Sequence, residues 1–340
     1  MKMRSFANLS ATWRGSELFA SKEWNVRLQT AELTELKFVA DSIGAELQDT
    51  QRADVRLSAL KQRLCAWQMA LEDGSGVVLA KGLPVKEWGE QRSTSAFWAI
   101  ALELGVPLCQ SADGEMLFHV RDRGYTPYDP RFRGPASRER LSFHTDRCDV
   151  IAFACLHQAN QGGNTYIVSS VSLYEHLRKN QPDLLTILCE PFPYLRHTVD
   201  TGNPLSFCRL PIFSEHNGHF AAHFLRVLID RADRSPNAPS LSPTQREALD
   251  ALESLAEDPS FHVQLHLQPG DILLLNNWTT LHRRSAFTDV PGSKTQRHLL
   301  RIWLSMPNSR PIAPCFQAHF GNTAPGAIRG GFRPHTDHDQ

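Results

Sequence analysis

Two histidine–carboxylate pairs, His144-Thr-Asp146 and His335-Thr-Asp337, have the spacing of a shared metal site. With 15 His and 36 Asp plus Glu in 340 residues, composition alone predicts one or two pairs of this kind. The spacing by itself therefore says little, and the surrounding sequence has to separate the two pairs.

The first pair has a structural context that the second lacks. His335 lies five residues from the C-terminus with no strand pattern before it, which indicates a solvated tail. His144 ends an apolar run over 141–144, and another apolar run begins at 150. A strand end is a rigid base from which His144 and Asp146 could both turn toward one metal ion.

A metal held in this way needs a third ligand from elsewhere in the chain, and His282 is the candidate. It follows the turn Pro269-Gly-Asp271, a buried strand and a short polar segment. A single histidine in such a place is more often an ordinary core residue. Two imidazoles and one carboxylate on one face of a metal, however, are typical of non-haem Fe(II) oxygenases.

Two arginines downstream indicate a site for anions. Arg297 and Arg301 lie in the apolar run Arg297-His-Leu-Leu-Arg301-Ile-Trp-Leu-Ser305. Side chains alternate between the two faces of a strand, so both arginines share one face. Buried guanidinium groups need anionic partners, and a guanidinium binds a carboxylate through two hydrogen bonds. The strand predicts either two anionic ligands, one of a cosubstrate and one of a substrate, or two structural ion pairs.

These residues require a scaffold of many short strands with helices around them. We expect strands at 77–80, 117–120, 141–144, 150–157, 165–168, 205–213, 220–225, 263–267, 272–276 and 299–305. We expect helices at 30–43, 52–71, 93–104, 172–180, 182–188 and 243–256. The pattern predicts an α+β fold around a barrel or jelly roll.

The expected organisation is one catalytic domain with two appendages. Residues 1–50 form an N-terminal extension of uncertain structure, residues 51–325 the domain with its helical additions, and residues 326–340 a C-terminal tail. The length suits one large domain of this kind.

Composition excludes several classes of protein. Lys plus Arg and Asp plus Glu are both 36, so the formal net charge is zero, which argues against a nucleic-acid partner. No apolar run approaches the roughly 20 residues of a bilayer span, and the N-terminus has no secretory signal pattern. Seven scattered Cys without a Cys-x-x-Cys pair favour a cytoplasmic protein without disulfides. The expected partner is a small molecule, and a homo-oligomer is compatible with the sequence.

Taken together, the motifs resemble a known family. In order along the chain they are His144-Thr-Asp146, Gly162-Gly-Asn-Thr165, Pro269-Gly-Asp271 through His282, and Arg297 through Arg301. This set is similar to the Fe(II)/2-oxoglutarate dioxygenases of the taurine dioxygenase and clavaminate synthase-like group, over about residues 140–305. The resemblance implies a double-stranded β-helix (jelly-roll) core with flanking helices.

The resemblance also implies roles for single residues. His144, Asp146 and His282 would be the catalytic iron ligands. Thr165 and Arg297 would bind the cosubstrate 2-oxoglutarate, and Arg301 would bind a substrate anion. The family often has Asp-Asn-Arg shortly before its last histidine, whereas this chain has Asn276-Asn277-Trp278. The surroundings of the ligands are therefore expected to differ from the family pattern.

The function implied is an oxygenase that uses Fe(II), 2-oxoglutarate and O2. It would hydroxylate, or otherwise oxidise, an unactivated C–H bond of a small anionic or amino-acid-like substrate and release succinate and CO2. Two alternatives stay open: a Zn(II)-dependent hydrolase on the same two-His-one-carboxylate site, and a non-catalytic jelly-roll binding module. The loop 121–140, with Tyr125 and Tyr128, is a candidate lid or an ordinary surface loop. His119 is a candidate for the pocket lining without a defined role.

Overall fold

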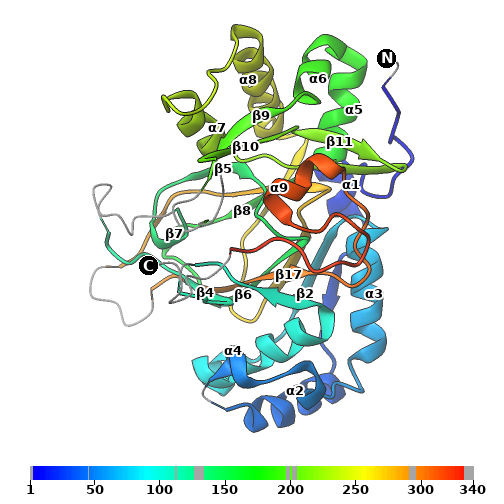
Figure 1. Cartoon of the computed structure of the whole chain (residues 1–340). Helices are drawn as coiled ribbons and strands as arrows, with labels where there is room; N and C mark the ends of the chain where they lie inside the picture. The colour runs from blue at the N-terminus through cyan, green and yellow to red at the C-terminus, as the bar shows by residue number, and fades with distance from the viewer. Residues whose placement is uncertain are drawn as a thin grey trace.

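Two sheets face each other at the centre of the computed structural model, which describes residues 3–44, 46–111, 113–125, 134–196, 200, 205–290 and 296–332 (Figure 1). The larger sheet has the order β1 (Asn25–Arg27), β2 (Val77–Lys81), β14 (Ile272–Asn276), β6 (Val150–His157), β17 (His298–Ser305), β3 (Val106–Leu108). Strand β4 (Leu117–Val120) also pairs with β17. The smaller sheet has the order β13 (His262–Leu265), β8 (Thr165–Ser169), β15 (Thr280–Arg284), β5 (Leu141–His144).

Strand β14 contributes side chains to the hydrophobic core on both faces of the larger sheet. Leu273 and Leu275 point between the two sheets, and Ile272 and Leu274 point to the helices outside. All four side chains are fully buried, so the run is continuously apolar instead of alternating. The space between the sheets is the interior of the jelly roll, and the candidate site lies at one end of it.

Helices cover both outer faces of the sheets (Figure 1). The outer face of the larger sheet packs against α2 (Thr30–Ser42), α3 (Lys61–Glu72) and α4 (Val85–Leu104). The outer face of the smaller sheet lies under α5 (Ser170–Asn180), α6 (Pro182–Leu188) and α8 (Pro243–Glu257). Helix α8 begins with Pro243 at its first turn, where the missing N–H costs nothing, and Ser242 accepts a hydrogen bond from the backbone N–H of Gln245 at 3.1 Å.

The remaining elements are short. They are α1 (Gly15–Ala20), α7 (Arg226–Asp233), α9 (Gln317–Phe320), β7 (Gln161–Gly162), β9 (Phe192–Leu195), β10 (Phe207–Leu210), β11 (Phe213–His216), β12 (His219–Ala222) and β16 (Phe287–Thr288). Four single turns of 3-10 helix lie at Leu47–Asp49, Arg52–Asp54, Gly134–Ala136 and Pro314–Phe316.

The expected helix over 52–71 is wrong in its first half. Helix α3 begins only at Lys61, and one 3-10 turn occupies Arg52–Asp54. Val55 and Leu57 are buried on either side of an exposed Arg56, which is the period of an extended segment. Helix α4 begins earlier than expected, because a kink at Gly89 (φ 74°) joins a preceding turn to the helix proper.

The ends of the described chain are packed against the core. Strand β1 pairs in parallel with β2, and α2 packs against α4, so part of the expected N-terminal extension completes the larger sheet and its helical layer. Arg329, within the expected tail, is 2% exposed. The domain boundaries themselves stay a prediction. No helix among the described residues is long and apolar enough to cross a membrane.

Candidate metal centre and anion pocket

Neighbouring strands of the smaller sheet bring the predicted metal ligands together. His282 on β15 lies directly opposite His144 at the end of β5, and Asp146 follows two residues later. The Nε2 atom of His282 is 3.4 Å from Oδ2 of Asp146, and the centres of the two imidazole rings are 4.5 Å apart. One possible ligand atom from each of the three residues lies within 4.8 Å of the others.

Local hydrogen bonds orient these side chains. Nδ1 of His144 is 2.7 Å from the carbonyl oxygen of Ser142, a contact in which Nδ1–H donates and Nε2 keeps its lone pair for a metal. Asn277 Oδ1 accepts a hydrogen bond from the backbone N–H of Asp146 at 3.1 Å. At 276–278, where the sequence departs from the family pattern, the side-chain amide of Asn277 therefore holds the backbone of Asp146 in place.

The protonation states suit a divalent cation. Burial, followed by the neighbouring His282, lowers the pKa of His144 to about 4. Burial alone would raise the pKa of Asp146, but the contact with His282 and the charge of Arg301 outweigh it and hold that pKa well below its usual range. A neutral imidazole and an ionised carboxylate are the forms that bind metals. Asp146 Oδ2 is buried without a hydrogen-bond partner, so the donor set fits Fe(II).

Arg297 is a buried cation aimed at the same space. Its side chain is 2% exposed, and Nε and Nη1 have no hydrogen-bond partner, while Nη2 donates to the carbonyl oxygen of Gly163 at 3.4 Å. Burial lowers the pKa of Arg297 to about 10, which still leaves it charged at neutral pH. Within the described ranges no carboxylate side chain forms an ion pair with it. A bound carboxylate would supply the missing acceptors.

A glycine and a threonine shape the surroundings of Arg297. A Cβ atom added at Gly163 would lie 2.7 Å from Nε of Arg297, and the φ of +68° already favours glycine. Thr165, two residues further along, is 7% exposed and lines the same cavity. The predicted cosubstrate residues thus line one cavity together with the candidate metal centre.

Arg301 also lines the cavity, on the inner face of β17 like Arg297. Its Nε donates to Oε1 of Gln110 at 2.8 Å, and its guanidinium lies over the rings of Phe118 and Trp303 at 5.2 and 5.0 Å. The predicted pairing of two arginines on one face of this strand is therefore confirmed in its geometry.

The cavity, of about 830 Å³, is strongly cationic. Among the described residues, its lining contains three acidic side chains and ten arginines: Arg140, Arg147, Arg196, Arg226, Arg231, Arg234, Arg283, Arg284, Arg297 and Arg301. Half of these arginines are ion-paired within the part of the chain that the structure describes: Arg147 and Arg196 share Asp200, Arg140 and Arg283 share Glu257, and Arg226 contacts Asp230 and Glu253. The excess of positive charge nevertheless makes the cavity a binding site for anions.

The comparison with known families identifies the chain. Residues 30–303 match the family described as taurine catabolism dioxygenase TauD, TfdA family. The chain belongs to the TauD/TfdA family. It is a 2-oxoglutarate-dependent dioxygenase whose cofactors are Fe(II), 2-oxoglutarate and O2.

Individual relatives are similar over most of the chain. FR-33289 synthase of Streptomyces rubellomurinus is 28% identical, over 91% of this chain and 93% of its own length. The taurine hydroxylase-like protein SAT17 of Stachybotrys chartarum is also 28% identical, over 89% of this chain and 80% of its own. These matches, like the family match, do not favour the zinc hydrolase.

Solved structures support the jelly-roll fold. An asparagine oxygenase in complex with Fe(II), 2S,3S-3-hydroxyasparagine and succinate has a TM-score of 0.64 at 17% identity, with 83% of this chain and 93% of that chain covered. The non-haem iron oxygenase OrfP with Fe and alpha-ketoglutaric acid has a TM-score of 0.61 at 16% identity, with 83% and 94% covered. The α+β jelly-roll prediction is confirmed.

Several residues near the site were not found by sequence reasoning. Arg284 is 6% exposed and lines the cavity; burial, followed by Arg297, lowers its pKa to about 9. Its position two residues after His282 on one strand could have revealed it, because such residues share a face. Arg196 and Asp200 carry no comparable signal, since only the fold brings them near Arg147.

Other expectations have mixed outcomes. His119 does not line the cavity; it faces α4 on the other side of the larger sheet. In the candidate lid, residues 126–133 and with them Tyr128 lie outside the described residues, as do His335 and Asp337.

Proposed function

We propose that this member of the TauD/TfdA family oxidises an unactivated C–H bond of a small anionic substrate, with His144, Asp146 and His282 as its iron ligands. The observation that carries the proposal is the arginine-rich cavity around these three side chains. In its lining, Nε of Arg284 and both Nε and Nη1 of Arg297 are buried without hydrogen-bond partners, which favours ligands that bring negative charge.

In this proposal, different residues of the chain bind the cosubstrate and the substrate. Thr165 and Arg297 hold 2-oxoglutarate, whose distal carboxylate supplies the acceptors that Nε and Nη1 of Arg297 lack. Arg301 orients the anionic group of the substrate from the same strand face. Phe153 and Leu299 provide apolar walls that keep water out. Bound Fe(II), with 2-oxoglutarate and O2, supplies the oxidising chemistry and releases succinate and CO2.

Names among the relatives agree with an anionic substrate. A uridine-5'-phosphate dioxygenase of Amycolatopsis sp is 28% identical over 43% of this chain, and its named substrate carries a phosphate. The SAT17 protein is named for taurine, which carries a sulfonate. Together with the charge of the cavity, these names support sulfonates, phosphates and carboxylates as substrate classes to test.

The proposal is tested in two steps. Anaerobic protein loaded with Fe(II) and 2-oxoglutarate is screened by absorption spectroscopy for compounds that perturb the metal-to-ligand band. Compounds that do so are then assayed under O2 for succinate release and for one added oxygen atom or the loss of two hydrogens. We expect the effective compounds to be anionic, and neutral amides or esters of the same compounds to be inactive. A neutral substrate turned over as fast as its anionic counterpart would contradict the proposal.

A further inference from the structure

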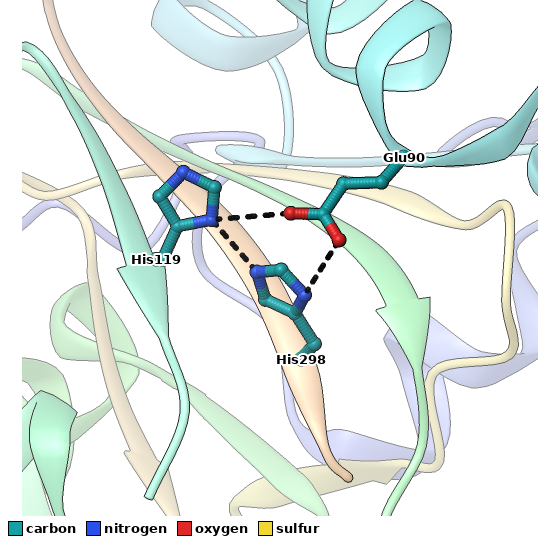
Figure 2. A group of neighbouring side chains, drawn as sticks. All are labelled: Glu90, His119 and His298. Atoms are coloured by element: carbon teal, nitrogen blue, oxygen red, sulfur yellow. Dashed lines mark hydrogen bonds and ion pairs between the residues drawn. The ribbon is translucent and has the colours of Figure 1, made fainter. Parts of the chain in front are cut away.

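A second group of metal-ligating side chains lies on the opposite face of the larger sheet. It consists of Glu90 on α4, His119 on β4 and His298 at the start of β17 (Figure 2). Each residue offers one ligand atom within 4.8 Å of the other two. The composition, two imidazoles and one carboxylate, is the same as in the triad His144, Asp146 and His282.

The strand geometry keeps the two groups apart. Arg297, directly before β17, lines the inner cavity together with Leu299 and Arg301, whereas Leu300 packs outward against the helices and His298 lies beside Glu90 of α4. His119 on β4 lies directly opposite Leu300 on β17, so its side chain is on that same outer face. Helix α4 packs over this face and brings Glu90 to the two histidines (Figure 2).

The distances suit a small divalent ion. Nδ1 of His119 is 2.8 Å from Nε2 of His298 and 3.8 Å from Oε1 of Glu90, and Nδ1 of His298 is 3.8 Å from Oε2 of Glu90. Zinc bonds of about 2.0–2.2 Å in a tetrahedron place neighbouring ligand atoms roughly 3.4 Å apart. The 3.8 Å separation of His119 Nδ1 from Glu90 is close to that value, whereas the 2.8 Å contact between the two rings is a hydrogen bond that a shared ion would replace; the Glu90 side chain, 53% exposed, is free to adjust.

The group does not work as a simple ion-pair cluster. Burial lowers the pKa of His119, and burial, opposed by Glu90 and reinforced by His119, lowers the pKa of His298 to about 4. Both imidazoles are therefore neutral at pH 7, and the Glu90 carboxylate faces them without a counter-charge between them. Neutral imidazoles and an ionised carboxylate need no proton removed before they bind a metal.

We propose that Glu90, His119 and His298 form a second metal site, which binds one divalent transition-metal ion of the zinc type. Two nitrogen donors favour zinc and its neighbours over calcium or magnesium, which prefer oxygen ligands. The ion would join α4 to β4 and to the start of β17, where His298 directly follows Arg297.

The experiment counts zinc in a chain whose first site has been removed. In a His144→Ala/His282→Ala background, equilibrium dialysis against low-micromolar free Zn(II) is followed by elemental analysis. We expect one zinc per chain in the background, and none after the further substitution Glu90→Gln or His119→Ala. His219→Ala, which removes an exposed histidine on β12, is the matched control and should retain the zinc. Because Glu90 and His119 are partly exposed, these substitutions spare the core, and circular dichroism checks folding.

Thermal unfolding gives a second readout that does not depend on activity. A ligand that binds only the folded state raises Tm. Zinc should therefore raise the Tm of the background and of the His219→Ala chain but not that of the His119→Ala chain. The proposal is overturned if the background binds no zinc, or if the bound zinc and the Tm shift survive both Glu90→Gln and His119→Ala.

Discussion

At the scale of single residues, the chemistry depends on buried polar atoms that the protein leaves without hydrogen-bond partners. Asp146 Oδ2 and the Nε and Nη1 atoms of Arg297 are buried without hydrogen-bond partners. Burying such groups costs free energy unless a ligand completes them. The two groups carry opposite charges. The Asp146 carboxylate can bind a metal ion, and the Arg297 guanidinium can bind the carboxylate of a ligand, which is the combination that an Fe(II)/2-oxoglutarate site requires.

Replacing Asp146 tests the metal centre directly. We expect Asp146→Ala to reduce succinate release to background and to lower iron retained after gel filtration, because two imidazoles alone hold Fe(II) weakly. The fold should persist, since the carboxylate is not part of the apolar core. Asp337→Ala, in the second His-Thr-Asp sequence, is the matched control and should leave activity unchanged. Full activity in the Asp146→Ala chain would remove Asp146 from the ligand set.

Replacing Arg297 tests the cosubstrate site. Charge-assisted hydrogen bonds to a buried carboxylate are each worth about 1.5–3 kcal/mol, so Arg297→Ala should raise KM for 2-oxoglutarate by about 10- to 100-fold. In thermal unfolding, 2-oxoglutarate with Fe(II) should stabilise the parent chain far more than the variant. A change in KM for the organic substrate alone would transfer the cosubstrate role to Arg301.

The residues that sequence reasoning found and those that it missed differ in a physical way. His144 with Asp146, and Arg297 with Arg301, could be predicted because short spacing and strand periodicity link the members of each pair, whereas His282 was assigned through the order of motifs that the chain shares with the family. Glu90, His119 and His298 are joined only by the packing of α4 on the larger sheet. No spacing along the chain encodes a contact of that kind.

At the scale of elements, the least predictable part of the site was the strand that carries His282. The segment before it, Asn277-Trp278-Thr279-Thr280, is polar in sequence, yet all of these residues are at most 2% exposed. The fold supplies partners for most of them: Trp278 Nε1 donates to Oδ1 of Asp149 at 2.8 Å, and Thr280 Oγ1 donates to the carbonyl oxygen of Asn276 at 2.7 Å, whereas Thr279 Oγ1 has no hydrogen-bond partner. The partners of these polar groups come from the fold, so the sequence indicated only a short polar segment between a strand and His282.

The turn between β7 and β8 gives a prediction about cosubstrate binding. Gly163→Ala should raise KM for 2-oxoglutarate, because the new Cβ would meet Nε of Arg297 at 2.7 Å and displace the guanidinium. It should also lower the free energy of unfolding by about 1–2 kcal/mol, since an alanine at positive φ is strained. Steady-state kinetics and urea unfolding measure the two effects.

Gly124 supplies a matched control for that substitution. Its φ of +69° is nearly the same as the +68° of Gly163, but no atom lies within 4 Å of an added Cβ. Gly124→Ala should therefore show the backbone cost without the change in KM. Equal KM values in the two variants would show that the close approach to Arg297 is unimportant for cosubstrate binding.

At the scale of the whole molecule, a buried ion pair connects the last described segment to the centre of the fold. The Nε atom of Arg329 donates to Oδ1 of Asp149 at 2.6 Å, and both side chains are at most 2% exposed. Asp149 lies at the border between the 144–148 ligand loop and β6, and it also accepts hydrogen bonds from Trp278 and the backbone N–H of Met306. One carboxylate thus joins the metal-ligand loop, the β14–β15 turn and the C-terminal segment.

This arrangement predicts that the C-terminal segment contributes substantially to stability. Arg329→Met should lower the free energy of unfolding by about 3–5 kcal/mol, because it removes the counter-charge from a buried carboxylate. Urea unfolding without added metal measures this loss apart from any effect on iron binding. The double variant Asp149→Asn/Arg329→Met should recover part of the loss, since it leaves no buried charge unpaired. If Arg329→Met unfolds at the same urea concentration as the parent chain, the segment from 326 onward is an appendage, as the sequence suggested, and the ion pair adds nothing to the fold.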